Sequence, residues 1–235
     1  MLGSCCARID LVNRDHLIAL YPRLYHMAQE GSWPAISHHG LMTTTQLVDS
    51  SSSPADVRAV ITGRRRPKSL AIECDGLGTV VIRDQTPLRE QFLIDALTDG
   101  MTVKEWLDIL NNRVFFWLHP DRLAELLNAR RYRNHAHDVI VVDTASLVAA
   151  HADRIRLSAI NSGATLYPNA HERGPSTFMF IAEYPYEERR SRGVCGAIAE
   201  LAVIGGVPDI LRHTVRVERR QQDQILDVLY DADPS

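Results

Sequence analysis

The chain has 235 residues, of which 45% are apolar and 23% are charged, and its formal net charge at pH 7 is -3. This length is enough for one sizeable hydrophobic core, and this composition is ordinary for a soluble globular protein. The small negative charge excludes a general electrostatic attraction to nucleic acid or to anionic membranes, so such a contact would need a local basic cluster.

Four cysteines occur, at Cys5, Cys6, Cys74 and Cys195. They contain no CxxC pair, which argues against a structural zinc site, and their spacing does not resemble a disulfide framework. A reducing compartment is the simpler interpretation. The N-terminus lacks the pattern of a signal peptide, and no apolar run approaches the roughly 20 residues of a membrane span. We therefore expect a cytoplasmic protein without a membrane partner.

The first forty residues predict a helix, a strand and a second helix. Apolar residues among polar ones indicate a short amphipathic helix over Asp10–Leu20, and Pro22 ends it. A short strand is predicted over Arg23–Met27. Ser32 is expected to be the N-cap of the next helix, which has a proline in its first turn, and Gly40 its C-cap.

A serine-rich loop and a basic run stand out between residues 49 and 110. Asp49–Pro54 predicts a surface loop, with a mobile flap over a site as the functional alternative. The basic run is Arg64–Lys68. The other predicted elements of this region are three helices and one strand: helices over Pro54–Ile61, Gln91–Leu97 and Val103–Leu110, and a strand over Thr79–Ile82.

The middle of the chain contains its clearest strand. Val139–Asp143 begins with four β-branched residues and is bounded by charges. Before it, Val114–Leu118 is an apolar run of strand length, and Asp121 is expected to cap a helix over Arg122–Arg130. A short helix is predicted over Ser146–Ala152.

The last quarter predicts two strands, over Thr177–Glu183 and Thr214–Val217, and a terminal helix over Gln221–Leu229. Between them, Ala197–Val203 is apolar apart from Glu200. Strands and helices alternate, but not as regular strand–helix–strand units, which favours an α+β fold over a doubly wound parallel sheet. No linker rich in proline or glycine divides the chain, so we expect one domain over residues 1–235.

Several familiar sites are absent from the sequence. It contains no GxGxxG or GxxxxGK[ST] phosphate loop, no HExxH zinc motif and no GxSxG nucleophile turn. His38 and His39 are adjacent, so on a helix their side chains point apart, and His135 and His137 have no evident third ligand nearby. We therefore expect no metal site.

Glu200 and His26 are the first candidate site residues. A carboxylate within an apolar stretch is costly unless it is paired or hydrogen-bonded, so Glu200 is either functional or on the exposed face of its element. His26 lies near the end of the predicted first strand, where it could donate hydrogen bonds to ribose hydroxyls or be a core histidine bonded to the backbone.

Two further clusters are candidates for ligand binding. The basic run Arg64–Lys68, with Arg83 soon after it, suits phosphate oxygens, although a solvated charged loop has the same pattern. Aromatic residues over Phe115–Trp117 could stack on a nicotinamide or a base. Because successive residues of a strand face opposite sides, at least one face of this run must be core.

The order of these features resembles the DarT family of bacterial DNA-targeting ADP-ribosyltransferase toxins. The similarity covers about four-fifths of the chain as short blocks. The blocks that carry it are Leu24–Met27, Trp33–Ile36, His39–Leu41, Val114–Leu123, Val139–Val142 with Ser146-Leu147, Ala199–Val203, Val207-Pro208 and the strand at Val215. One departure lies after the aromatic strand, where Asp121-Arg122 stands in place of the family's Arg-Ser-Pro-Met.

The resemblance implies a split β-sheet core with flanking helices that holds NAD in a cleft. By matched position, His26 would bind the adenosine-side ribose, and Glu200 would hold the nicotinamide ribose for transfer. The arginine beside the pyrophosphate would be Arg65 or Arg83. The further cofactor contacts that the resemblance implies are Tyr25, Gly40, Leu41, Phe116 and Trp117.

The same resemblance implies that NAD is the substrate and that no metal is needed. The acceptor would be a nucleic-acid base, docked through Arg64–Arg66, or a protein side chain, and an antitoxin could be a partner. The alternative is a non-catalytic member of the fold that binds NAD, another nucleotide or a partner protein.

Overall fold

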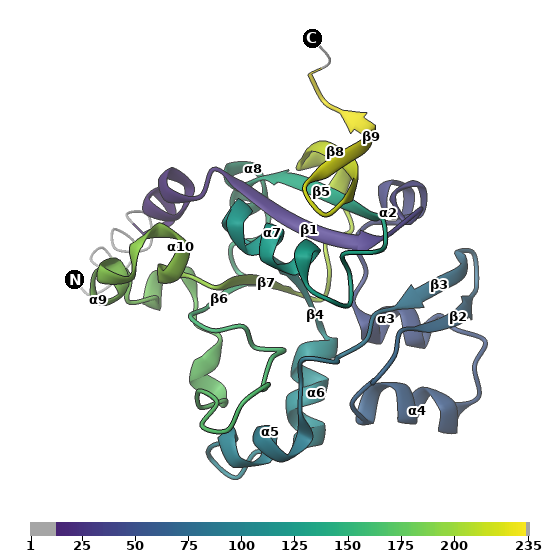
Figure 1. Ribbon diagram of the computed structural model, residues 1–235, viewed down its shortest axis with the longest axis horizontal. Coiled ribbons are helices and arrows are strands. Elements are labelled where there is room, and N and C mark those ends of the chain that lie inside the picture. Colours follow the sequence, from purple (N-terminus) through teal and green to yellow (C-terminus); the bar gives the residue numbers. More distant parts are fainter. Residues whose placement is uncertain (1–12, 234–235) are drawn as a thin grey trace.

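The computed structural model describes residues 13–233, apart from the side chain of Arg190, and it is a mixed α+β structure (Figure 1). All the strand pairs of its three sheets are antiparallel. The expected α+β class is therefore confirmed. Residues 10–12 of the predicted first helix, together with Cys5 and Cys6, lie outside the described residues; residues 13–20 are helical as expected.

The largest sheet has four strands in the order β1-β5-β8-β9. Their bounds are Arg23–Gln29 (β1), His137–Asp143 (β5), Thr214–Gln221 (β8) and Gln224–Asp231 (β9). A second sheet has the order β4-β7-β6, with bounds Arg113–Phe116 (β4), Glu200–Ile204 (β7) and Ile155–Ser158 (β6). The third is a hairpin of β2, Leu70–Cys74, and β3, Gly78–Ile82.

The two larger sheets meet at one backbone bridge. Tyr25 of β1 and Trp117, just after β4, exchange two N–H···O hydrogen bonds of 2.9 Å each. Side chains from both sheets also enter the same core, among them Leu24, Ile140 and Leu201. The sheets are therefore separate in their hydrogen-bonded ladders but share one hydrophobic interior (Figure 1).

The helices surround these sheets. Their bounds are Trp33–His39 (α2), Thr44–Asp49 (α3), Ala55–Gly63 (α4), Glu90–Ala96 (α5), Val103–Asn111 (α6), Pro120–Asn128 (α7), Thr144–His151 (α8), Tyr186–Arg189 (α9) and Gly193–Ala197 (α10). Short 3-10 turns follow Gly174, Phe180, Arg189 and Asp209. Over residues 13–233, none of the helices is long and apolar enough to cross a membrane.

A small lobe is formed by α3, α4 and the β2–β3 hairpin, seen in blue beside the main sheets in Figure 1. It has its own apolar cluster, made of Val48, Ile61, Ile72, Cys74 and Ile82. A cluster of this size buries far less apolar surface than the main core, so the lobe depends on polar contacts with the rest of the chain.

The predicted strand over Thr177–Glu183 is wrong. This segment forms two 3-10 turns, Pro175–Thr177 and Ile181–Glu183. Its apolar side chains pack in different places, since the partly buried Phe178 contacts the cluster around α6 whereas Ile181 enters the main core. Tertiary packing thus overrides the β propensity of the sequence.

The predicted terminal helix over Gln221–Leu229 is also wrong, because the chain forms the edge strand β9 there. Gln222 adopts φ 53°, in the left-handed region, and this tight turn sends the chain back along β8. Pairing with β9 satisfies the backbone groups along one edge of β8. A helix over the same residues would leave these groups of β8 without their partners.

Two predicted helix caps differ in detail. The N-cap of α7 is His119, whose Nδ1 accepts a 3.3 Å hydrogen bond from the backbone N–H of Asp121, so Asp121 itself is not the cap. Ser32 has the expected N-cap position of α2, but its side chain makes no capping bond. The backbone N–H of Trp33 donates to Asp138 Oδ2 instead, at 3.1 Å.

Candidate active site

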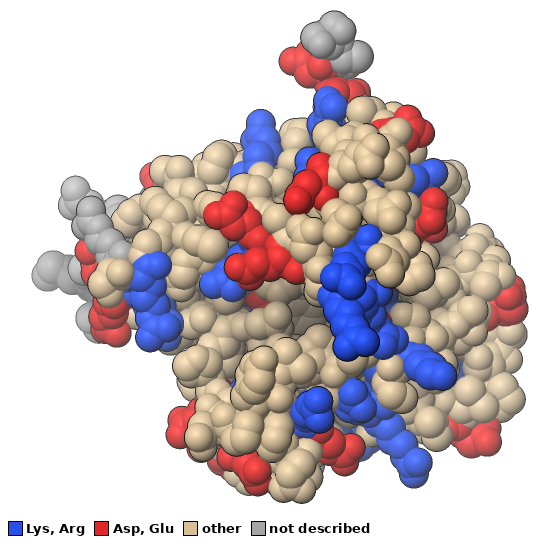
Figure 2. All heavy atoms as spheres, in the orientation of Figure 1, with Lys and Arg blue, Asp and Glu red and all other residues tan. Residues whose placement is uncertain are grey.

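A cavity of about 670 Å³ opens where β1, β4 and the start of β7 face the β2–β3 hairpin. This volume lies within the range of about 300–1,000 Å³ that is usual for small-molecule and cofactor sites. Figure 2 shows a hollow near the middle of this face, with Lys and Arg side chains gathered beside it. The sequence-predicted site residues that line the cavity are His26, Gly40, Leu41, Arg83, Trp117 and Glu200.

Glu200 is the first residue of β7 and lies in the cavity wall, with 5% of its surface exposed. Its Oε2 accepts two hydrogen bonds from Ser162, one from the backbone N–H at 3.1 Å and one from the hydroxyl at 2.6 Å. Burial raises its pKa to about 7, against the opposing effects of Ser162 and of the positive charges of Arg173 and Arg122. The alternative of a carboxylate on an exposed face is therefore wrong.

His26 lies in the middle of β1 and is half-buried in the cavity wall. Burial lowers its pKa to about 4, so the ring is neutral at pH 7. Its Nδ1 lies 2.9 Å from the carbonyl oxygen of Phe115, and a carbonyl can only accept, so Nδ1 carries the proton. Nε2 is then an acceptor, so it can accept a hydrogen bond from a hydroxyl but cannot donate one, contrary to the expectation from the sequence.

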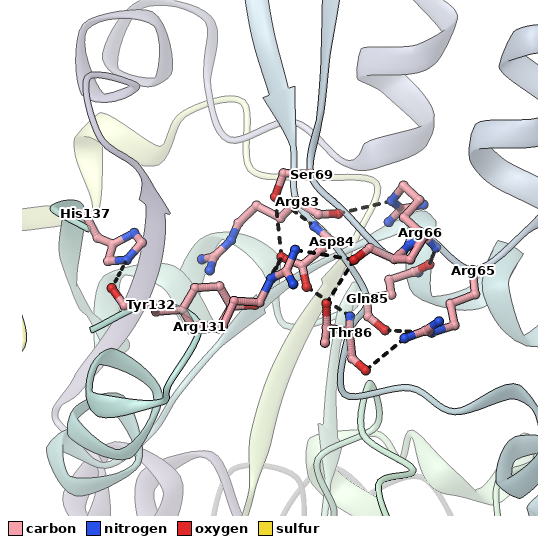
Figure 3. A network of polar contacts seen from close by, with 11 residues as sticks. Arg65, Arg66, Ser69, Arg83, Asp84, Gln85, Thr86, Arg131, Tyr132 and His137 are labelled. Atoms are coloured by element: carbon pink, nitrogen blue, oxygen red, sulfur yellow. Dashed lines mark hydrogen bonds and ion pairs between the residues drawn. The ribbon is translucent and has the colours of Figure 1, made fainter. Parts of the chain in front are cut away.

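Arg83 is the candidate arginine that reaches the cavity. It follows β3, donates to the carbonyl of Met27 at 2.9 Å, and stacks over the Tyr132 ring with its guanidinium carbon 4.6 Å from the centroid (Figure 3). Arg65 points elsewhere, since its guanidinium donates to the carbonyls of Gln85 and Thr86. Of the two arginines proposed for the pyrophosphate, the structure brings only Arg83 to the cavity.

Arg66 is a buried member of the basic run, which the sequence pattern suggested would be solvated. Only 6% of it is exposed, and burial lowers its pKa to about 10. It donates to the carbonyls of Arg83 and Ile61 and to Oδ1 of Asn111, at 2.9–3.1 Å. Asn111 in turn donates to the carbonyl of Thr62 at 2.9 Å, so this pair ties the lobe to the end of α6.

The aromatic run is divided between cavity and core. Phe115 and Trp117 line the cavity, whereas Phe116 is 1% exposed and packs in the main core. The structure therefore does not bring Phe116 to the cavity, because alternate strand residues face opposite sides. Tyr25 also lies outside the lining, in the cluster that packs α7 against the sheet.

At Gly40 and Leu41, which line the cavity, the backbone lies close to the segment at Val207 and Pro208. Gly40 ends α2 with φ 85°, and a Cβ there would lie 2.5 Å from Pro208 Cα. Leu41 and Val207 exchange two backbone hydrogen bonds of 2.8 Å each. Only glycine permits both the backbone conformation and this close approach, so Gly40 shapes the rim through its backbone.

The turn Asn161-Ser162-Gly163 is a cavity wall. Its small residues are typical of a turn that lines a pocket and also of a simple chain reversal, and the structure agrees with the first alternative. The sequence signal for a pocket wall is a serine within a turn of small residues, which lets the backbone come close to a neighbouring group. This combination is common in loops, so it has little specificity. Its proximity to Glu200 depends on long-range packing.

Two groups of residues within 13–233 place three potential metal-ligand atoms within 4.8 Å: His151 with Asp209 and His213, and His119 with Asp121 and Cys195. In the first group Arg154 donates to His151 Nδ1 at 2.7 Å, so His151 carries its proton on Nε2 and donates it to Asp209. As the structure stands, this group is a hydrogen-bond network between α8 and the loop after β7.

Residues 22–214 match the family model described as a family of unknown function, DUF7002. This range covers most of the chain, and the protein belongs to that family. Both His26 and Glu200 lie within the matched range, whereas β9 lies beyond it. Among curated proteins, none matches the sequence.

Proposed function

We propose that this protein is an NAD-dependent ADP-ribosyltransferase with a split β-sheet core. The observation that carries the proposal is that His26 and Glu200, from opposite ends of the chain and from different sheets, line the same cavity. The expected split core is supported by two antiparallel sheets whose ladders join only through the bridge of Tyr25 and Trp117 in the described part of the chain.

The chemistry assigned to Glu200 is electrostatic. The bond between C1′ of the ribose and the nicotinamide nitrogen breaks, and its electron pair leaves with nicotinamide. A nucleophile of the acceptor then bonds to C1′ and loses its proton to solvent. Positive charge develops on the ribose before that bond forms, and a carboxylate pre-placed in a largely dry wall stabilises it. Glu200 is buried, and its position is fixed by Ser162.

The other two residues bind rather than react. His26 is neutral and fixed through Nδ1, so its Nε2 accepts from a ribose hydroxyl. Arg83 uses Nη1 on the carbonyl of Met27 and packs on Tyr132, and its remaining N–H groups are the ones that we assign to phosphate oxygens. Trp117 offers an apolar face in the same cavity. This set matches the parts of NAD: ribose, pyrophosphate and an aromatic ring.

A nucleic-acid base is the acceptor class that we favour. Arg64 and Lys68 flank the cavity residue Arg66, and Arg130 and Arg133 flank the cavity segment at Tyr132. All four flanking side chains are exposed. They provide the local positive surface that the net charge of the chain does not, and Figure 2 shows basic side chains beside the hollow.

The test is incubation of the protein with labelled NAD and, in separate reactions, single-stranded DNA, RNA and a protein mixture. We expect label in nucleic acid, lost in Glu200→Gln and retained in Glu125→Gln, which changes an exposed glutamate of α7. Thermal stabilisation by NAD without transfer or hydrolysis in any reaction would favour the binding-only alternative. The absence of both thermal stabilisation and turnover at millimolar NAD would contradict the proposal.

A further inference from the structure

Arg173 is among the largest fully buried side chains of the protein, with 2% of its surface exposed. Burial lowers its pKa, the direction expected for a cation removed from water. Among residues 13–233 no carboxylate forms an ion pair with it. A buried guanidinium without a carboxylate partner is costly, so a specific set of acceptors must compensate for it.

Those acceptors are four backbone carbonyls, three of them in one turn. Nε donates to Ser162 O at 3.4 Å, Nη2 donates to Asn161 O at 3.3 Å and also to Ala164 O, and Nη1 donates to His171 O. Three of the four carbonyls belong to the turn at residues 161–164, whose first three residues form a wall of the cavity. The planar fork of arginine suits this cluster, whereas lysine has one compact ammonium group in its place.

The backbone of Arg173 is itself fixed at the end of α5. Its N–H donates to the carbonyl of Ala96 at 2.7 Å, and its carbonyl accepts from the N–H of Thr98 at 2.9 Å. The guanidinium therefore extends from a fixed point into the turn. The turn is therefore held by the buried side chain of Arg173 and not by contacts of its own exposed residues.

The turn acts on Glu200 through Ser162. Ser162 is 1% exposed, and both of its hydrogen bonds to Glu200 go to the same oxygen, Oε2. Within the described residues nothing donates to Oε1, and Glu200 lines the cavity. One oxygen is thus held by the protein, and the other is left for a ligand.

We propose that Arg173 is a positioning residue for Glu200: by clamping the turn at residues 161–164 it places Ser162 so that Oε2 is fixed and Oε1 faces the cavity. The effect on turnover rests on the proposed function, but the effect on the carboxyl group does not. Replacing Arg173 removes this donor from four carbonyls, so the turn shifts and Glu200 loses the two hydrogen bonds from Ser162, together with the nearby positive charge, that favour its ionised form.

The experiment is a 13C NMR titration of glutamate-labelled protein, with the Glu200 resonance assigned by its loss in Glu200→Gln. Arg173→Met and Ser162→Ala are each expected to raise the titration midpoint of Glu200, by about one pH unit or more in Arg173→Met. Arg173→Lys keeps a positive charge but loses the fork, so its midpoint should lie between those of wild type and Arg173→Met.

Arg154→Met is the matched control. Arg154 is half-buried and donates to the carbonyls of Ile204 and Gly206, away from Glu200. Its loss should lower the melting temperature and leave the Glu200 midpoint and the NAD turnover rate unchanged. In Arg173→Met, kcat for NAD cleavage should fall roughly 10- to 100-fold with little change in KM, since the loss concerns the transition state.

The outcomes separate the two proposals. If wild type does not cleave NAD, the proposed function fails, and the titration still decides whether Arg173 positions Glu200. An unchanged midpoint in Ser162→Ala, or an equal shift in Arg154→Met, would overturn the positioning role. If Arg173→Met does not fold, Ser162→Ala and Arg173→Lys decide the question.

Discussion

The two walls of the cavity are held in different ways. The strand wall, formed by His26, Trp117, Ser162 and Glu200, belongs to elements that pack on the main core. The hairpin wall, formed by Arg66, Leu77, Val80 and Arg83, belongs to a lobe with a small core of five buried residues. The proposed reacting group, Glu200, therefore lies on the side with the larger core, and the proposed pyrophosphate contact, Arg83, comes from the side that can move at lower cost.

This comparison predicts different kinetic effects for the two walls. Changes at Glu200 or Ser162 in the strand wall should lower kcat, because Glu200 is the group proposed to act on the reacting bond and Ser162 holds it. Changes in the hairpin wall should raise KM for NAD, because they alter how the cofactor is held.

The largest expected effect is that of Glu200→Gln in the strand wall. Loss of the pre-placed negative charge should lower kcat for NAD cleavage roughly 100- to 1,000-fold. NAD should still bind, because the residues proposed to hold the pyrophosphate and the adenosine ribose are unchanged, and this can be measured by calorimetric titration. A kcat equal to that of the surface control Glu125→Gln would refute the assignment.

Arg66→Met is the corresponding test of the hairpin wall. It leaves the carbonyls of Ile61 and Arg83 and the amide of Asn111 without their buried donor, so the free energy of unfolding should fall by roughly 2–4 kcal/mol. Urea denaturation measures this. Arg65→Met removes a half-exposed guanidinium that donates to two carbonyls and should cost under about 1 kcal/mol. Equal losses in the two variants would show that Arg66 does not tie the lobe.

The pKa of Glu200 predicts a pH-dependent stability. Burial raises it from 4.5 to about 7, so the folded state binds this proton more tightly, and the associated stability is lost as the pH rises from 4.5 through about 7. Glu200→Gln should therefore be more stable than wild type by about 2 kcal/mol at pH 8, and by under about 1 kcal/mol at pH 5. Urea denaturation at both pH values measures the difference. A gain that does not depend on pH would contradict the burial of an ionisable group.

Arg83→Gln should have a smaller effect, confined to cofactor binding. Because glutamine carries no positive charge for the pyrophosphate, KM for NAD should rise about tenfold with little change in kcat, as expected for one charge-assisted hydrogen bond. Steady-state kinetics with Arg58→Gln, on α4, as control would measure this. If kcat falls instead of KM rising, Arg83 acts on the reacting bond and the division between the walls is wrong.

The smallest expected effect concerns the exposed basic residues. Neutralising Arg64 and Lys68 together should reduce the slope of log K against log salt for single-stranded DNA by roughly one to two, at about 0.7 for each phosphate that is no longer neutralised. Filter binding at several salt concentrations provides the slope. An unchanged slope would show that nucleic acid does not dock beside the hairpin wall.

The strand wall could be predicted from the sequence better than the hairpin wall. Period-2 patterns and β-branched residues locate most of β1, β4 and β5, and an isolated carboxylate in an apolar run marks Glu200. The sequence does not predict the strands β2 and β6, because four or five residues carry little periodicity. The pattern of β9 indicates a helix, and the strand forms there because β8 supplies its pairing partner.

The basic run illustrates what local patterns miss. Arg64, Arg65 and Arg66 are adjacent in sequence, yet the first is exposed, the second caps carbonyls of a loop and the third is buried. The partners of Arg65, and two of the three partners of the Arg66 side chain, lie more than fifteen residues away in sequence. The contact of Ser162 with Glu200, and the clamp by Arg173, likewise depend on packing that no local pattern encodes.

The most direct test is to measure the release of nicotinamide from NAD at pH 8, using chromatography to monitor it, for wild type and Glu200→Gln. NAD binding is measured on the same samples. We expect release by wild type only, with binding of NAD to both proteins. Binding and release by both proteins at equal rates, or no binding to either, would contradict the assignment of this cavity to NAD.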